Sequence, residues 1–143
     1  MSTPGVASTN AGAQRIAAAF SDSGKRAALM PYLMGGFPSI AGSLAIGHAY
    51  ADGGADLVEL GIPFSDPLAD GPVVAAAGTA ALRAGTTIAG VLEVCEGLAP
   101  RLPVVLMCYA NQVLVRGPEA FANALRDAGA SGLIVPDLPM EEA

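Results

Sequence analysis

The sequence has few charged residues and few aromatic ones. Only 14% of its 143 residues are Asp, Glu, Lys or Arg, and only 5% are Phe, Trp or Tyr. Seven Lys and Arg stand against thirteen Asp and Glu, which gives a net charge of −6. A nucleic-acid surface needs clustered Lys and Arg to neutralise phosphates, and an anionic membrane attracts the same residues. The composition therefore argues against nucleic acid and membrane as partners.

Long apolar runs and cysteine frameworks are also missing. Although 52% of the residues are hydrophobic, no uninterrupted apolar stretch approaches the roughly 18 residues of a membrane span. The two cysteines, Cys95 and Cys108, have no metal-site spacing and form no disulfide framework. We expect both to be small core residues in a reducing cytoplasm, in a protein with no metal and no cofactor.

The first residues, 1–13, contain neither a basic start nor an apolar segment. They therefore lack the features of a secretion signal. We expect residues 1–13 to form a flexible tail and residues 14–143 to form a single domain.

Short apolar runs alternate with turn residues along the rest of the chain. The pattern predicts a first helix over 14–20, followed by strand and helix four times over, with the last helix missing or barely begun. The expected strands are 27–34, 56–61, 103–109 and 133–135, and helices are expected to begin at Pro38-Ser39, Pro72, Thr86-Thr87 and Pro118. On the helix from Pro72, the expected inner face consists of Val73, Ala77, Ala80, Ala81 and Ala84. Such alternation predicts an α/β fold with a parallel sheet.

Glu59 is the first candidate for chemistry, because it lies between Val58 and Leu60 in a strand expected to be buried. An ionised buried carboxylate costs several kcal/mol unless it is paired, and no Lys or Arg occurs between Arg26 and Arg83. We therefore expect burial to raise the pKa of Glu59 toward the range useful for proton transfer. In the alternative, Glu59 faces solvent, and Asp66 and Asp70 are ordinary turn residues.

Several polar side chains follow the carboxyl ends of the expected strands. Ligands of parallel α/β folds bind at these ends, so Glu59, Asp70, Tyr109 and Asp137 are expected to share one mouth. Tyr109 lines a pocket in this interpretation. By default, an isolated tyrosine completes the core and keeps its hydroxyl in water.

The stretch from Glu59 to Pro72, ELGIPFSDPLADGP, resembles the signature of the tryptophan synthase alpha chain family at all fourteen positions. Supporting matches are PYLMGGFP at 31–38, MCYAN at 107–111 and PDLP at 136–139. The resemblance thus extends along nearly the whole chain from about Ala27.

This resemblance implies an eight-stranded βα (TIM) barrel, of which the chain would supply the first four βα units as a half barrel. The family cleaves indole-3-glycerol phosphate to indole and glyceraldehyde 3-phosphate in tryptophan biosynthesis. By resemblance, Glu59 is the general acid/base, and Asp70 stabilises the protonated indolenine through the ring N–H. Tyr32 and Tyr109 match positions that shape the indole pocket.

The loop of residues 62–71 matches the family's mobile segment that meets a beta subunit and closes over substrate. The expected contact residues are Pro63, Phe64, Ser65, Asp66 and Pro67, and the family's assembly is an alpha2-beta2 tetramer. The family's phosphate site lies in its second half, and a complete barrel needs about 250 residues. We therefore expect a piece of a longer chain whose first and fourth strands are open edges.

Two other functions compete with the lyase. The chain could be a non-catalytic module whose 62–71 loop docks on a beta subunit without turnover. It could also be another barrel enzyme with paired carboxylates, such as an aldolase or isomerase. The lack of a Lys near any strand end for Schiff-base chemistry, and of metal-ligand clusters, counts against this last option.

Overall fold

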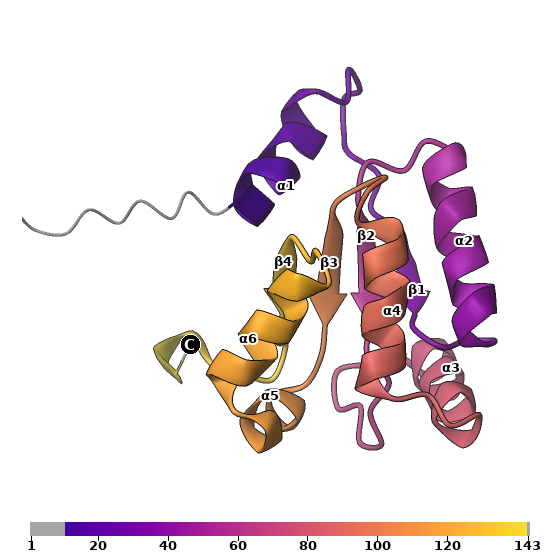
Figure 1. Cartoon of the computed structure of the whole chain (residues 1–143), viewed down its shortest axis with the longest axis vertical. Helices are drawn as coiled ribbons and strands as arrows, with labels where there is room; N and C mark the ends of the chain where they lie inside the picture. The colour runs from indigo at the N-terminus through magenta and orange to yellow at the C-terminus, as the bar shows by residue number, and fades with distance from the viewer. Residues whose placement is uncertain (1–10, 143) are drawn as a thin grey trace, which may run out of the picture.

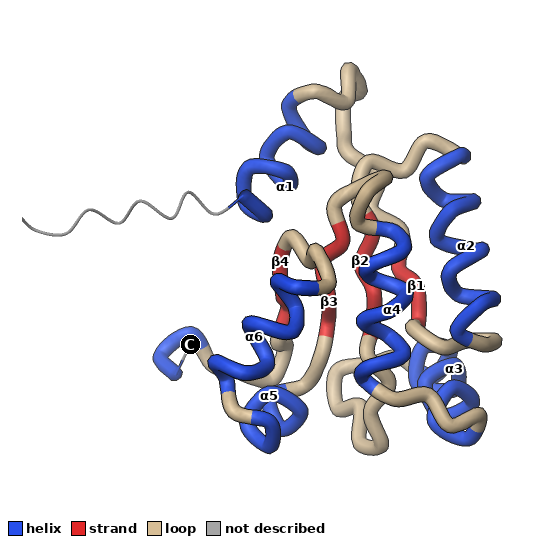
Figure 2. Tube along the Cα trace, in the orientation of Figure 1, coloured by secondary structure: helices blue, strands red, loops and turns tan. Residues whose placement is uncertain are grey.

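The computed structural model describes residues 11–142, in which strands alternate with helices (Figures 1 and 2). Within this range, no helix is both long enough and apolar enough to cross a bilayer. In chain order the elements are α1 (Ala11–Ser21), β1 (Tyr32–Met34), α2 (Ile40–Asp52), β2 (Val58–Gly61), α3 (Pro72–Arg83), α4 (Ile88–Leu98), β3 (Val104–Met107), α5 (Ala110–Arg116), α6 (Pro118–Asp127), β4 (Gly132–Ile134) and the 3-10 turn η1 (Met140–Glu142).

The four strands form one sheet in the order β1-β2-β3-β4, and every neighbouring pair is parallel. This topology confirms the predicted α/β fold. The register aligns Tyr32 with Glu59 and Glu59 with Val105. Because side chains alternate between the two faces of a strand, Tyr32 and Glu59 point to the same face of the sheet.

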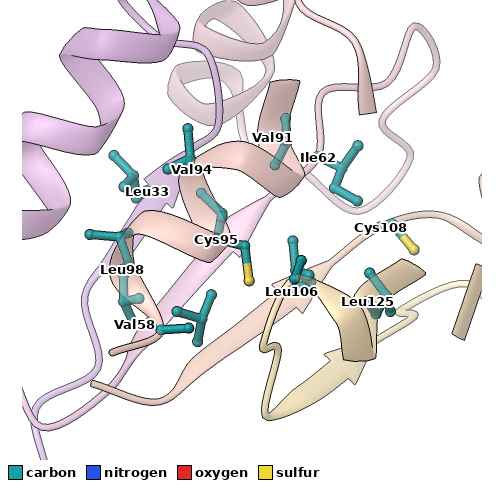
Figure 3. Close-up of a cluster of buried hydrophobic side chains, with 14 of the residues drawn as sticks. Leu33, Val58, Ile62, Val91, Val94, Cys95, Leu98, Leu106, Cys108 and Leu125 are labelled. Carbon is teal, nitrogen blue, oxygen red and sulfur yellow. The ribbon is translucent and has the colours of Figure 1, made fainter. Parts of the chain in front are cut away.

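The opposite face of the sheet carries the core. Figure 1 shows α2, α4 and α6 along this face, and Figure 3 shows Val91, Val94 and Leu98 of α4 above the strands. These three side chains are fully buried, as are Val58 and Leu106 below them. The helices approach closely: a Cβ added to Gly47 of α2 would lie 2.5 Å from Leu98 Cδ1. Burial of these aliphatic side chains is the main stabilising contribution to the sheet and its helices.

Two predicted helix starts are confirmed by side-chain caps. The Ser39 hydroxyl accepts a hydrogen bond from the Gly42 N–H at 2.9 Å, and the Thr87 hydroxyl accepts one from Gly90 N–H at 3.2 Å. The helices α3 and α6 begin at Pro72 and Pro118, as expected. Proline suits a first helical position because the N–H that it lacks would have no partner there.

The first strand is shorter than predicted, and the first helix is longer. Regular pairing starts at Tyr32, because Pro31 has no N–H to donate to a ladder. Before it, the chain is held by isolated contacts, such as the hydrogen bond from Leu29 N–H to the Asp56 carboxylate at 2.7 Å. Helix α1 begins at Ala11, so residues 11–13 of the expected tail are helical. Residues 1–10 lie outside the described part of the chain.

The predicted inner face of α3 is right at Ala81 and wrong at Val73, Ala80 and Ala84, which are exposed, and α5 was not predicted. Val73 is 81% exposed, and the residues that α3 buries are Gly78 and Ala81. The physical reason is that α3 packs at the end of β1: a Cβ on Gly78 would meet Met34 and Pro63. Such a helix buries only a narrow face. The helix α5 occupies 110–116, a stretch for which no element was expected.

Candidate active site

The residues expected at one mouth, Glu59, Asp70, Tyr109 and Asp137, all lie at or beyond the carboxyl ends of the strands. Figure 1 shows that the loop after β2, α3 and α5 all lie at this end of the sheet. Glu59 lies on β2 with Tyr32 beside it on β1, and Asp70 lies at the end of the loop, directly before the Gly71 N-cap of α3. The two acids come from one strand and the loop that follows it, as the sequence predicted.

Glu59 is half-buried, and its carboxylate makes no hydrogen bond or ion pair with any residue in 11–142. Burial raises the pKa of Glu59, and the negative charge of Asp70 raises it further. Both causes favour the protonated acid. The predicted direction of the pKa shift is confirmed.

The Tyr32 phenol experiences the negative charges of both Glu59 and Asp70. Burial raises the pKa of its phenol well above the ordinary value, and the charges of Asp70 and Glu59 add to this shift. The phenol is therefore neutral over the whole physiological range. Its hydroxyl lies 3.9 Å from Met34 Sδ. Tyr32 thus presents a neutral ring beside two carboxylates.

Tyr109 holds the end of the loop. Its hydroxyl donates to Asp70 Oδ1 at 2.9 Å and accepts from the Ala69 N–H at 3.0 Å. The side chain is only 1% exposed, and its ring stacks on Phe64 with 5.3 Å between centroids. The default expectation for Tyr109, a hydroxyl in water, is wrong, because Asp70 is brought to that hydroxyl by the loop.

Gln112 was missed by the sequence analysis. Its Nε2 donates to the Pro63 carbonyl at 3.2 Å, and its Oε1 accepts from the Tyr109 N–H at 3.1 Å. A Gln at the third position of a helix is a known partner for the N-cap N–H, so a prediction of α5 would have identified the bond to the Tyr109 N–H but not the bond to Pro63. Asp137 also acts on α5: its carboxylate accepts from the Ala110 N–H at 2.9 Å.

The five expected subunit-contact residues differ in their surroundings. Pro63 is buried, and Phe64 is engaged with Tyr109, whereas Ser65 and Asp66 are exposed and Pro67 is intermediate. A cavity of about 320 Å³ lies beside this loop and is lined by Pro63, Phe64 and Ser65 together with residues of α4 and α5. A second cavity of about 700 Å³, between α1, α6 and β4, is lined by none of the predicted site residues. Within residues 11–142, no cluster of His, Cys, Asp or Glu could hold a metal ion.

Comparison with known proteins identifies the family. A sequence profile described as tryptophan synthase alpha chain matches residues 19–143. The chain belongs to the tryptophan synthase alpha chain family. The tryptophan synthase alpha chain of Methanosarcina acetivorans is 46% identical over 137 residues, which cover 94% of this chain and 50% of that protein. The alpha chain of a Synechococcus strain, CC9902, is 52% identical over 120 residues, which cover 82% and 45%.

Solved structures give the same result for the fold. Tryptophan synthase from M. tuberculosis, in an aminoacrylate-bound form, is similar with a TM-score of 0.86 and 41% identity, over 90% of this chain and 54% of that one. The a2b2 complex from Pyrococcus furiosus is similar with a TM-score of 0.77 and 34% identity, over 81% and 50%. The chain thus spans about half the length of its tryptophan synthase alpha chain relatives, and its four strands correspond to half of their TIM barrel.

Proposed function

We propose that the chain carries the acid/base residues for the aldol cleavage of indole-3-glycerol phosphate to indole and glyceraldehyde 3-phosphate. The observation that carries this proposal is the placement of Glu59, with its raised pKa, beside Asp70 at the carboxyl ends of the strands. Family membership supports the same reaction in tryptophan biosynthesis.

The cleavage needs one group that both gives and takes a proton. Glu59 donates a proton to C3 of the indole ring, which converts the ring to an indolenine cation. The resulting carboxylate then takes the proton of the adjacent glycerol hydroxyl. The C–C bond breaks, its electron pair returns to the ring as indole, and the hydroxyl carbon becomes the aldehyde. The raised pKa suits Glu59 to this role, because burial and the charge of Asp70 favour the protonated acid that must first give its proton.

Asp70 stabilises the charge that develops on the ring. Its carboxylate accepts a hydrogen bond from the indolenine N–H. The Tyr109 hydroxyl donates to Asp70 Oδ1 and thereby fixes the orientation of the carboxylate. A carboxylate held in place before reaction stabilises developing charge without reorganising. Tyr32 and Tyr109 then form walls of the indole pocket, with the Tyr32 phenol neutral.

A beta subunit is the proposed macromolecular partner. Ser65 and Asp66 are exposed on the 62–71 loop, with Pro67 partly so, and these three residues supply the contact in our proposal. On the inner side of the loop, the Pro63 carbonyl accepts from Gln112, and the Phe64 ring stacks on Tyr109. Through these two contacts, a shift of the loop on binding the beta subunit moves the start of α5. The complex from Pyrococcus furiosus, with its mutual activation, supports this type of partner.

The test is indole release from indole-3-glycerol phosphate by the purified chain, with and without a tryptophan synthase beta subunit. We expect Glu59→Gln and Asp70→Asn to abolish turnover, and Glu93→Gln, the same change on the exposed face of α4, to leave it intact. Substantial turnover by Glu59→Gln would overturn the role of Glu59. Co-elution with the beta subunit without indole release would instead favour the non-catalytic docking module.

A further inference from the structure

We propose that Gln112 is a positioning residue for the loop that carries Asp70. The inference deepens the proposed function, on which it rests, because it assigns the geometry of the Asp70 carboxylate to a residue outside the acid pair. Gln112 belongs to the first turn of α5 and is half-buried.

The amide of Gln112 makes two hydrogen bonds to two different segments. Its Nε2 donates to the Pro63 carbonyl, across 49 residues of sequence, and its Oε1 accepts from the Tyr109 N–H. One side chain therefore fixes the start of the 62–71 loop relative to the backbone of Tyr109. The amide makes this possible because it carries a donor and an acceptor on separate atoms of one side chain.

Tyr109 fixes the other end of the same loop. Its hydroxyl bonds to Ala69 N–H and Asp70 Oδ1, and its ring stacks on Phe64. The loop is consequently held at Pro63, at Phe64 and at Ala69-Asp70 by side chains of two residues, Tyr109 and Gln112. Because Gln112 also bonds to Tyr109 itself, the two holding residues form one unit, which we term the α5 clamp.

A simpler role for Gln112 would be to cap α5 and nothing more. The hydrogen bond from Tyr109 N–H is the cap, and the hydrogen bond to Pro63 is the clamp. Gln112→Glu separates the two, since a carboxylate still accepts from the Tyr109 N–H but cannot donate to a carbonyl. Under a pure capping role, this variant leaves the loop unchanged.

The experiment is amide hydrogen exchange of the whole 143-residue chain, followed by mass spectrometry of peptides from the loop, from α5 and from α2. One net hydrogen bond contributes about 1 kcal/mol, which corresponds to a roughly fivefold change in an opening equilibrium. We expect Gln112→Glu to raise loop exchange about fivefold and to leave α5 and α2 at wild-type rates. Gln112→Leu, which loses both bonds, raises exchange in the loop and in the first turn of α5.

Gln14→Leu is the matched control, because Gln14 is exposed on α1 and loses the same amide. Wild-type exchange of the loop in Gln112→Glu would overturn the proposal, as would an equal rise in the α2 peptide, which would mean global loosening. Exchange requires no turnover, so this result is independent of the proposed lyase activity. In a preparation that releases indole, we expect Gln112→Glu to lower kcat about fivefold at unchanged KM. A variant whose loop exchanges faster while its kcat stays at the wild-type value would also overturn the proposal.

Discussion

The Tyr109 hydroxyl and the Asp70 carboxylate are joined by a 2.9 Å hydrogen bond between positions 39 residues apart in the sequence. The same hydroxyl accepts from the Ala69 N–H, so its donor and its acceptor sites are both used and its orientation is fixed. The side chain is buried, and burial raises the pKa of this phenol. Tyr109 therefore keeps its proton and donates it in the hydrogen bond to Asp70.

Replacement of Tyr109 by Phe tests this relationship. The variant keeps the ring that stacks on Phe64 and removes both hydroxyl bonds, so we expect destabilisation by about 1–2 kcal/mol and faster amide exchange at Ala69 and Asp70. Tyr50→Phe is the matched control, since its hydroxyl donates to the Tyr32 carbonyl and not to the loop. A loop in Tyr109→Phe that exchanges at the wild-type rate would contradict the assignment. Thermal unfolding and exchange measure the two effects.

The sequence predicted which residues meet, but not how they are held. Glu59 and Asp70 could be placed together because parallel strands present their carboxyl ends at one edge. The clamp could not be predicted, because α5 is a single short helix of seven residues with two polar residues in its first turn. The helix α5 is held by contacts with the loop and with Asp137. Such tertiary contacts cannot be predicted from the local sequence pattern.

The same limit explains the error on α3. The Ala-rich sequence after Pro72 fits a helix, and a helix of small residues has no strongly apolar side to mark its buried face. The burial of Gly78 and Ala81 and the exposure of Val73 follow from where the helix sits, at the end of β1 near Met34. By contrast, α4 has larger apolar side chains, and three of its four buried residues, Val91, Cys95 and Leu98, lie at helical spacing in the sequence.

Gly61 is expected to be intolerant of a side chain. A Cβ at this position would lie 2.0 Å from the Tyr32 hydroxyl and 2.7 Å from the ring carbon that bears it, so the whole rigid ring would have to move. We expect Gly61→Ala to destabilise the fold by about 1–3 kcal/mol through overpacking. Gly78→Ala is the mild control, because its Cβ would lie 3.2 Å from the flexible end of Met34 and at an ordinary 4.0 Å from Pro63 Cβ.

The clash at Gly61 can be attributed to Tyr32 by a double-mutant cycle. In a Tyr32→Leu background, which removes the ring, Gly61→Ala should cost clearly less than in the wild type. Equal costs in both backgrounds, measured by chemical denaturation, would mean that the added methyl group disturbs the strand itself and not the tyrosine.

The two cysteines are expected to be inert in the folded protein. Burial raises the pKa of the Cys95 thiol to about 12 and that of Cys108 to about 12, with Asp137 adding to the second shift. At pH about 8, only about one thiol in ten thousand would be ionised, and the thiolate is the reactive form. Alkylation followed by mass spectrometry should label neither cysteine until the protein unfolds.

An exposed cysteine provides the control for that measurement. Ser65→Cys places a thiol on the exposed part of the loop, and it should react at the rate of a free thiol under the same conditions. Rapid labelling of native Cys108 would contradict its burial, and would show that the end of β3 opens without global unfolding.

Glu59 should reduce the stability of the fold at neutral pH. Its pKa is raised in the folded protein, first by burial and then by Asp70, so folding favours its protonated form. The contribution of Glu59 to the free energy of unfolding is fully present below the pKa that Glu59 has in the unfolded chain, about 4. This contribution is lost as the pH rises through the higher pKa that Glu59 has in the folded protein. Glu59→Gln mimics the protonated form and avoids this loss.

We therefore expect Glu59→Gln to be more stable than the wild type at pH about 7 and equal to it below pH about 4. The gain should be below ~1 kcal/mol, because solvent screens a half-exposed carboxylate, and thermal unfolding across this pH range measures it. Glu93→Gln, on an exposed face of α4, should show no such gain. A variant less stable than the wild type at pH about 7 would mean that the ionised Glu59 makes a favourable interaction, and its carboxylate would then be unsuited to hold the proton that the proposed cleavage requires.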